Sequence, residues 1–154
     1  MAKEIERKFL IADDSWRQGA SGLRYRQGYL TTEPSRTVRV RMAGEKGYLT
    51  IKGKSSGAAR LEYEYEIPAA DANEMLDGLC LRPIIEKVRY KVTYAGMTWE
   101  IDEFEGDNAG LLIAEVELET EDQQVELPVW IGEEVTGDQR YYNASLIARP
   151  FNTW

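Results

Sequence analysis

The sequence contains no histidine and only one cysteine, and these two absences exclude several kinds of site. Without histidine there is no Ser-His-Asp triad, no phosphohistidine intermediate and no use of the commonest zinc ligand. Cys80 has no second cysteine with which to form an internal disulfide. It lies in the apolar run 75–80, which indicates a buried structural thiol rather than a nucleophile. Any catalysis must therefore use groups other than histidine.

Long apolar runs are also missing. None approaches the roughly 18 residues that a membrane span needs, and the N-terminal residues enter a charged, strand-like segment with no apolar signal region. We therefore expect a cytoplasmic protein with no membrane partner. The 154 residues are within the range of one domain, and neither a linker nor a repeat divides them. We expect residues 1–154 to form a single domain.

Charge is divided unevenly along the chain. Residues 1–61 carry 13 Lys and Arg against 6 Asp and Glu, whereas residues 62–154 carry 6 against 21. The net charge of −8 hides this division. A basic half and an acidic half within one small domain indicate a site that needs both signs.

Strict alternation of charged and apolar residues recurs in at least seven segments. This pattern is typical of β-strands, because successive side chains point to opposite faces. The segments are 4–10, 38–42, 49–54, 61–67, 87–92, 99–102 and 114–119. Most of the chain is therefore predicted to be strand.

Few helices are expected. Asp71 is a plausible N-cap, with Glu74 completing a capping box and Met75, Leu76 and Leu79 at helical spacing. A second helix is predicted from Asp138 until Pro150 stops it, and a short one within 120–128.

The charged faces of these strands mostly repeat one sign. Side chains at i and i+2 lie roughly 7 Å apart, so a face selected only for solubility should mix signs. Rows of like charge are tolerable when ligands of opposite charge lie between them, namely divalent cations against carboxylates and a polyanion against Lys and Arg. A closed barrel with its charged face inward would bring these rows together. A phosphate chain with a bound metal supplies the cation for the carboxylate rows and the anion for the Lys and Arg rows.

Two sets of candidate residues follow. Carboxylates at i and i+2 on neighbouring strands supply the hard oxygen ligands that Mg²⁺ or Mn²⁺ prefers, and the strongest candidates are Glu4, Glu6, Asp102, Glu115 and Glu117. Planar guanidinium groups grip phosphate oxygens with several donors, and ammonium groups add positive charge. The candidates for phosphate binding are Arg39, Arg41, Lys8, Lys52, Lys54, Lys87, Arg89 and Lys91.

The sequence argues against two other modes of phosphate binding. Gly53-Lys54-Ser55 looks like the end of a P-loop, but Tyr48 stands where the first glycine is required. Binding of nucleic acid is not expected, since the acidic residues of 62–154 would repel a long duplex.

The opening Glu4-Ile5-Glu6-Arg7-Lys8-Phe9-Leu10 matches the ExExK signature of the CYTH superfamily, also called triphosphate tunnel metalloenzymes. The match continues in order at 24–30, 38–41, 50–52, 62–64, 86–90, 101–102 and 114–118. The stretch 132–141 resembles the closing stretch of short bacterial members, several of which are inorganic triphosphatases. The resemblance implies one CYTH-like domain of mainly β (α+β) structure, an eight-stranded antiparallel β-barrel tunnel with a charged lumen and a few flanking helices.

The resemblance also implies roles. It adds Glu62 to the metal ligands and assigns Lys87 and Tyr29 to the activation of water. Free Lys and Tyr titrate near ~10. The pair therefore works at neutral pH only if cations such as Arg89 and Lys91 lower its pKa, or if a second metal acidifies the water. The plainer alternative for Tyr29 is an aromatic side chain packed on the lumen wall.

The activity so implied is metal-dependent hydrolysis of inorganic triphosphate, with Mg²⁺ or Mn²⁺, to phosphate and pyrophosphate by attack of water. A nucleoside or thiamine triphosphatase and a class IV adenylyl cyclase remain alternatives on the same fold. A non-catalytic polyphosphate-binding module is the alternative from another class. The expected partner is a small triphosphate or polyphosphate, and a homodimer is left open.

Overall fold

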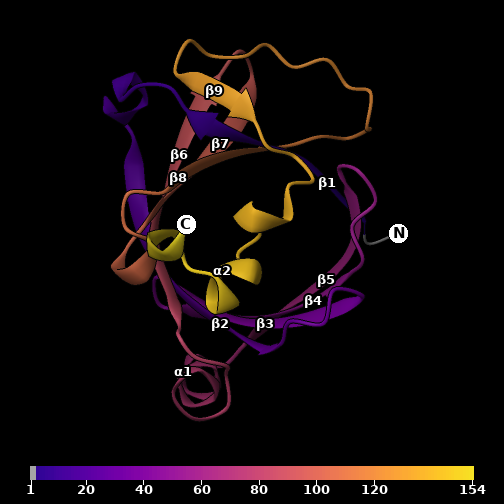
Figure 1. Ribbon diagram of the computed structural model, residues 1–154, viewed down its shortest axis with the longest axis vertical. Coiled ribbons are helices and arrows are strands. Elements are labelled where there is room, and N and C mark those ends of the chain that lie inside the picture. Colours follow the sequence, from indigo (N-terminus) through magenta and orange to yellow (C-terminus); the bar gives the residue numbers. More distant parts are fainter. Residues whose placement is uncertain (1–2) are drawn as a thin grey trace.

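The computed structural model describes residues 3–154 and shows a β-barrel with helices outside it and across one end (Figure 1). Met1 and Ala2, the start of the expected domain 1–154, lie outside the described residues. The barrel strands are β1 (Lys3–Ile11), β2 (Ser21–Thr31), β3 (Arg36–Ala43), β4 (Lys46–Gly53), β5 (Ala59–Ile67), β6 (Ile85–Tyr94), β7 (Met97–Phe104) and β8 (Leu112–Glu117).

All strand pairings are antiparallel, in the order β5-β4-β3-β2-β6-β7-β8-β1, and β5 pairs again with β1 to close the ring. This confirms the predicted barrel. A further strand, β9 (Ile131–Glu134), pairs with residues 9–11 of β1, whereas β5 pairs with residues 3–5. β1 is therefore the strand on which the barrel closes.

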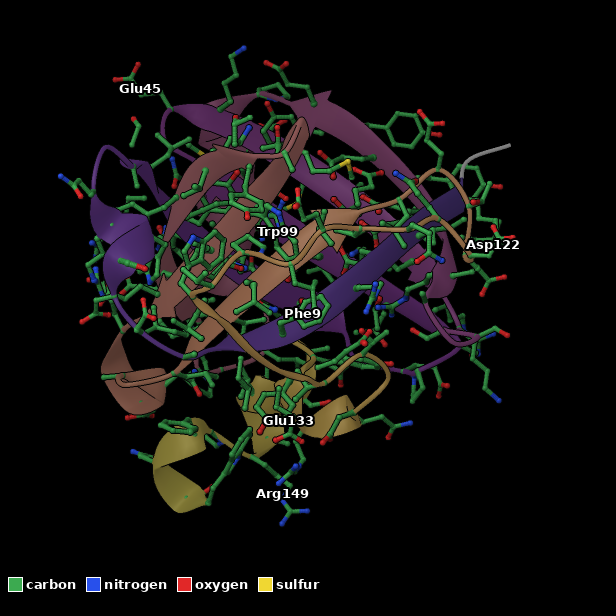
Figure 2. The ribbon with its side chains drawn as sticks, turned by 90° about the horizontal axis from the view of Figure 1, so that it is seen from above. Phe9, Glu45, Trp99, Asp122, Glu133 and Arg149 are labelled. Atoms are coloured by element: carbon green, nitrogen blue, oxygen red, sulfur yellow. The ribbon has the colours of Figure 1, made fainter. Side chains whose placement is uncertain are left out.

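The outer face of most barrel strands is apolar, as the alternation predicts. Around β1, β7 and β8, a buried cluster includes Phe9, Trp99 and Val116, with Trp130 from the loop before β9 packed on it. The rings of Phe9 and Trp99 meet edge to face with centroids 5.6 Å apart, and Figure 2 shows the two side chains near each other. A 3₁₀ helix, η1 (Ser15–Arg17), adds Trp16 to this cluster.

The helix α1 (Ala69–Gly78) covers the outer face of β3 and β4. Its Leu76 is fully buried in a cluster with Val40 and Met42 of β3. The prediction of Asp71 as N-cap is wrong by one turn. Pro68 takes the cap position, because its carbonyl already accepts the bond from the Ala72 N–H at 3.0 Å, and proline fits a helix start.

The predicted continuous helix from Asp138 to Pro150 is also wrong. The segment forms η3 (Gln139–Tyr141), α2 (Ser145–Ala148) and, after Pro150, η4 (Phe151–Thr153). Tyr142 has extended dihedral angles, φ −73° and ψ 133°, which break the helix. Asp138 accepts bonds from Arg140 and so caps only the first short piece.

Residues 120–128 contain no helix. Side chains there bond to their own neighbourhood instead: Gln123 accepts from the Glu119 N–H, and Asp122 accepts from the Thr120 hydroxyl. Such local bonds compete with helix formation. A 3₁₀ turn, η2 (Gly106–Asn108), joins β7 to β8. No helix within residues 3–154 has the length and apolar character needed to cross a membrane.

The C-terminal segment lies across one end of the barrel (Figure 1). Its Tyr141, Leu146 and Ile147 join one apolar cluster with inner-face residues of three strands, Ile85, Phe104 and Ile113. The lumen is therefore charged along most of its length and apolar where the C-terminal segment covers it.

Candidate active site in the barrel lumen

The lumen encloses a cavity of about 620 Å³. This volume is within the range of small-molecule sites, roughly 300–1,000 Å³. Most of the residues that the sequence predicted for the site lie on its wall. They are Glu4, Glu6, Lys8, Tyr29, Arg39, Arg41, Lys52, Lys54, Glu62, Lys87, Arg89, Glu115 and Glu117.

The register of the barrel sets rows of opposite charge side by side. Lys8 is paired with Glu115 across β1 and β8, Lys52 with Glu62 across β4 and β5, and Arg89 with Asp102 across β6 and β7. Neighbouring strands therefore already supply part of the opposite charge that the rows of like charge need.

One side of the cavity carries carboxylates from β1, β5 and β8. Lys52 Nζ lies 3.2 Å from Glu4 and 4.0 Å from Glu62, while Lys8 Nζ lies 3.3 Å from Glu115 and 3.8 Å from Glu6. The carboxylates outnumber these two lysines. Glu117 lies at the exposed end of the row, and burial with the nearby charge of Glu4 raises its pKa.

Two of these carboxyl groups have pKa values well above the ordinary value of 4.5. Burial and the charge of Glu115 raise the pKa of Glu6 to about 8. Burial and a hydrogen bond to Glu4 raise the pKa of Glu62 to about 8 as well. The hydrogen bond from Glu62 and the charge of Lys52 outweigh burial at Glu4 and lower its pKa. The acidic wall is therefore under-neutralised, because its carboxylates carry more negative charge than Lys8 and Lys52 offset.

The opposite side carries a cluster of arginines. Arg39 and Arg41 on β3 are 6% and 8% exposed. Burial, Arg39 and Arg89 lower the pKa of Arg41 to about 10, because three guanidinium groups share a small volume. The Nε of Arg39 is buried and has no hydrogen-bond partner among the described residues. A cationic cluster with an unpartnered buried donor is suited to bind an anion with several oxygens.

Lys87 lies between the two sides and is 1% exposed. Its Nζ donates to Asp102 Oδ2 at 2.7 Å and to Asn143 Oδ1 at 2.9 Å. Burial, and then the charges of Arg89 and Arg41, lower the pKa of Lys87 to about 7 even though Asp102 opposes the shift. In a substantial fraction of the molecules, Lys87 is therefore a neutral amine at neutral pH.

Two predicted site residues do not line the cavity. Lys91 is exposed at the far end of β6, and it is not among the residues that line the cavity. Asp102 is buried behind the wall, where Arg89 donates to both of its oxygens at 2.7 and 2.9 Å. Arg89 and Lys87 outweigh the effect of burial and lower the pKa of Asp102 to about 2. Both of its oxygens accept from these cations in the structure, and its role as a metal ligand stays a prediction.

Comparison with known proteins decides the family, since residues 2–151 match the CYTH domain. The chain belongs to the CYTH family. Over 154 residues it is 53% identical to an inorganic triphosphatase of Acetivibrio thermocellus, covering 100% of this chain and 99% of that protein. Over 148 residues it is 40% identical to an inorganic triphosphatase of Nitrosomonas europaea, covering 93% and 95%.

Solved structures agree with the CYTH assignment. A crystal structure of an inorganic triphosphatase superposes with a TM-score of 0.66 at 36% identity, covering 96% of this chain and 95% of that one. For CYTH triphosphatases a divalent metal requirement is implied, without the metal being identified.

The residues of this CYTH barrel fit such a metal in their chemistry. Hard divalent cations prefer carboxylate oxygens, and the raised pKa values of Glu6 and Glu62 mark where positive charge is lacking. Within residues 3–154, no three carboxylates yet converge as a ready-made metal site. Lys8 and Lys52 occupy the spaces between them instead.

Sequence reasoning missed several residues on the CYTH cavity wall. Tyr25 contributes a ring 4.9 Å from the guanidinium carbons of both Arg41 and Arg89. On β2 the charged residues face outward, where Arg24 pairs with Glu105 and Arg26 with Asp77. The uncharged face of β2 is the one that faces the lumen. The missed wall residues include Tyr25, Arg60, Glu64, Tyr142 and Asn143.

Proposed function

We propose that this protein hydrolyses inorganic triphosphate to phosphate and pyrophosphate with a divalent metal, Mg²⁺ or Mn²⁺, as cofactor. The observation that carries the proposal is the pairing of an under-neutralised acidic wall with an arginine cluster inside one cavity. A metal–triphosphate complex presents cations to the first and phosphate oxygens to the second. The names of two close relatives, both inorganic triphosphatases, support the same substrate.

The phosphate chain binds to cations on several strands. Arg39 offers its unpartnered Nε, and Arg41 and Arg89 lie beside it. Lys8, Lys52 and Lys54 reach the same cavity from β1, β4 and the residues that follow β4. These groups neutralise charge on the phosphate oxygens and hold the chain for in-line attack, which is most of what phosphoryl transfer needs.

Five carboxylates would hold the metal: Glu4, Glu6, Glu62, Glu115 and Glu117. The bound cation would supply positive charge at the phosphate oxygens and acidify a coordinated water. Asp102 would act from behind the wall by orienting Lys87 and Arg89.

Lys87 is the group that we assign to the activation of water. With a pKa of about 7, its amine is able to accept a proton from water near neutral pH. Tyr29 is buried beside the cavity and also packs in the apolar cluster of the C-terminal segment. We keep Tyr29 as a second candidate that orients the water.

The test is release of phosphate from tripolyphosphate, ATP, thiamine triphosphate and pyrophosphate, each with Mg²⁺, Mn²⁺ or EDTA. We expect release from tripolyphosphate that depends on the metal. Glu4→Gln should abolish most of it, while the same substitution at Glu45, exposed at the edge of the molecule in Figure 2, should not.

Other outcomes identify the alternatives. Preferred hydrolysis of ATP or thiamine triphosphate would make the protein a nucleoside or thiamine triphosphatase. Formation of cyclic AMP without hydrolysis would make it a cyclase. Tight binding of tripolyphosphate with no turnover in either metal would reduce it to a polyphosphate-binding module.

A further inference from the structure

Asn143 reaches from the C-terminal segment to the buried lysine of the active site. Its Oδ1 accepts from Lys87 Nζ at 2.9 Å and from Gln27 Nε2 at 2.9 Å. Gln27 is fully buried, and its own Oε1 accepts from Arg41 Nε at 3.1 Å. A continuous chain of hydrogen bonds therefore joins the segment that covers the barrel to both Lys87 and Arg41.

The direction of every bond in this chain is determined. A guanidinium only donates, so the Gln27 oxygen must face Arg41, and the Gln27 amide nitrogen must then donate to Asn143. The oxygen of Asn143 is thereby the atom that faces Lys87. Asp102, held ionised by Arg89, is likewise only an acceptor. Among the described residues, Lys87 consequently has two hydrogen-bond partners that accept and none that donates.

The two N–H groups of the neutral Lys87 amine each donate to one of these acceptors. An amine nitrogen has two N–H groups and one lone pair, arranged tetrahedrally. With one N–H on Asp102 and the other on Asn143, the lone pair takes the remaining direction, and Lys87 borders the cavity. If either acceptor were missing, the amine would rotate and the lone pair would have no fixed direction.

We propose that Asn143 is a positioning residue that, together with Asp102, aims the lone pair of Lys87 at the attacking water. The inference rests on the proposed function. In the step it serves, water loses a proton to Lys87 Nζ and its oxygen forms a bond to the terminal phosphorus. The bond from that phosphorus to the bridging oxygen breaks, and pyrophosphate leaves with the electron pair.

Anchoring of the C-terminal segment does not explain this contact. Tyr141, Leu146 and Ile147 already hold the segment in a buried apolar cluster. The side-chain oxygen of Asn143 instead accepts hydrogen bonds from two buried polar groups of the barrel. The segment that covers the barrel thus also completes the active site.

The experiment is a double-mutant cycle on tripolyphosphate turnover with Asn143→Leu, Lys87→Ala and the double variant. Lys87→Ala should lower kcat about 100-fold or more, as expected for loss of a general base. Asn143→Leu should lower kcat at least about 10-fold with KM changed less than about twofold, since a misdirected catalytic group costs up to ~100-fold. In the Lys87→Ala background, Asn143→Leu should have no further effect.

Leu146→Ala serves as the matched control, because it loosens the same segment without touching Lys87. Its effect on kcat should be the same in both backgrounds. The inference is overturned if Asn143→Leu costs the same factor with and without Lys87, or if it leaves the wild-type kcat unchanged. If Asn143→Leu fails to fold, Asn143→Ala is read by the same criteria. An inactive wild type overturns the proposed function itself, which separates the two failures.

Discussion

Arg39 carries a guanidinium that the fold buries without giving each of its N–H groups a partner. Its Nη2 donates to Thr50 at 3.3 Å and lies 3.7 Å from Glu64, while its Nε is unpartnered within the described residues. A buried donor without an acceptor costs roughly 1–3 kcal/mol. A phosphate oxygen bound at this position would remove that cost.

Replacing Arg39 with Gln should therefore lower kcat/KM for tripolyphosphate. A charge-assisted hydrogen bond is worth about 1.5–3 kcal/mol, which corresponds to about 10- to 150-fold. Steady-state kinetics would measure the change. Lys91→Gln removes one positive charge from the same barrel but at an exposed position outside the cavity, and it should stay within about twofold. Equal losses in the two variants would contradict a specific role of Arg39.

Alternation located the acidic and basic residues of the wall, because a period of two assigns each side chain to one face of a strand. Alternation failed on the strand whose charged residues face outward instead of into the lumen. On β2, Arg24 and Arg26 face outward toward Glu105 and Asp77, so the inward Tyr25 and Gln27 carried no charge signal. Asp102 follows the alternation but does not line the cavity. Alternation does not indicate which neighbouring side chain a charged residue contacts, and Asp102 contacts Arg89.

At the scale of elements, strands were more predictable than helices. Strand periodicity survives because most barrel strands have one face in the lumen and the other in an apolar cluster. The exception is β2, which carries Arg24 and Arg26 on its outer face. The C-terminal segment has no such regular surroundings. It breaks at Tyr142 so that Tyr142 and Asn143 line the cavity while Leu146 and Ile147 pack in the apolar end. No local sequence signal specifies these tertiary contacts.

The helix α1 stabilises the barrel from outside and takes no part in the site. Leu76 is fully buried between α1 and β3, whereas Leu79 at the end of the helix is 70% exposed. Leu76→Ala should reduce the free energy of unfolding by about 2–5 kcal/mol, and Leu79→Ala by about 0.5 kcal/mol or less. Urea unfolding measures both.

The KM for tripolyphosphate should be unchanged in Leu76→Ala under conditions where the variant is folded. A large change in KM would show that α1 influences the lumen, contrary to its position on the outer face of β3 and β4.

The whole molecule concentrates ionisable groups in its interior, and its stability should depend on pH accordingly. Glu6 and Glu62 have pKa values of about 8 in the fold against an ordinary value of 4.5. A raised carboxyl pKa contributes stability that is complete below pH 4.5 and is lost as the pH rises through 8. Lys87, with its pKa lowered to about 7, offsets part of this loss only above pH 7.

The melting temperature of the metal-free protein should therefore fall between pH 5 and pH 7. This window lies within the range from 4.5 to about 8 set by Glu6 and Glu62. Glu6→Gln, which mimics the protonated acid, should flatten the slope. Addition of Mn²⁺ at pH 7 should raise the melting temperature of the wild type more than that of the variant. Thermal unfolding in EDTA and in Mn²⁺ gives these values, and a slope equal in both proteins would refute the assignment.

The two faces of each barrel strand have a consequence for how this chain varies over evolutionary time. On β1, positions 4, 6 and 8 face the lumen, while Ile5 and Phe9 pack outside. Selection for folding and selection for chemistry therefore act on interleaved but different positions. On β1, substitutions at positions 4, 6 and 8 should change catalysis first, whereas substitutions of Ile5 and Phe9 should change stability first, so adjacent residues of one strand are expected to be replaced for different reasons.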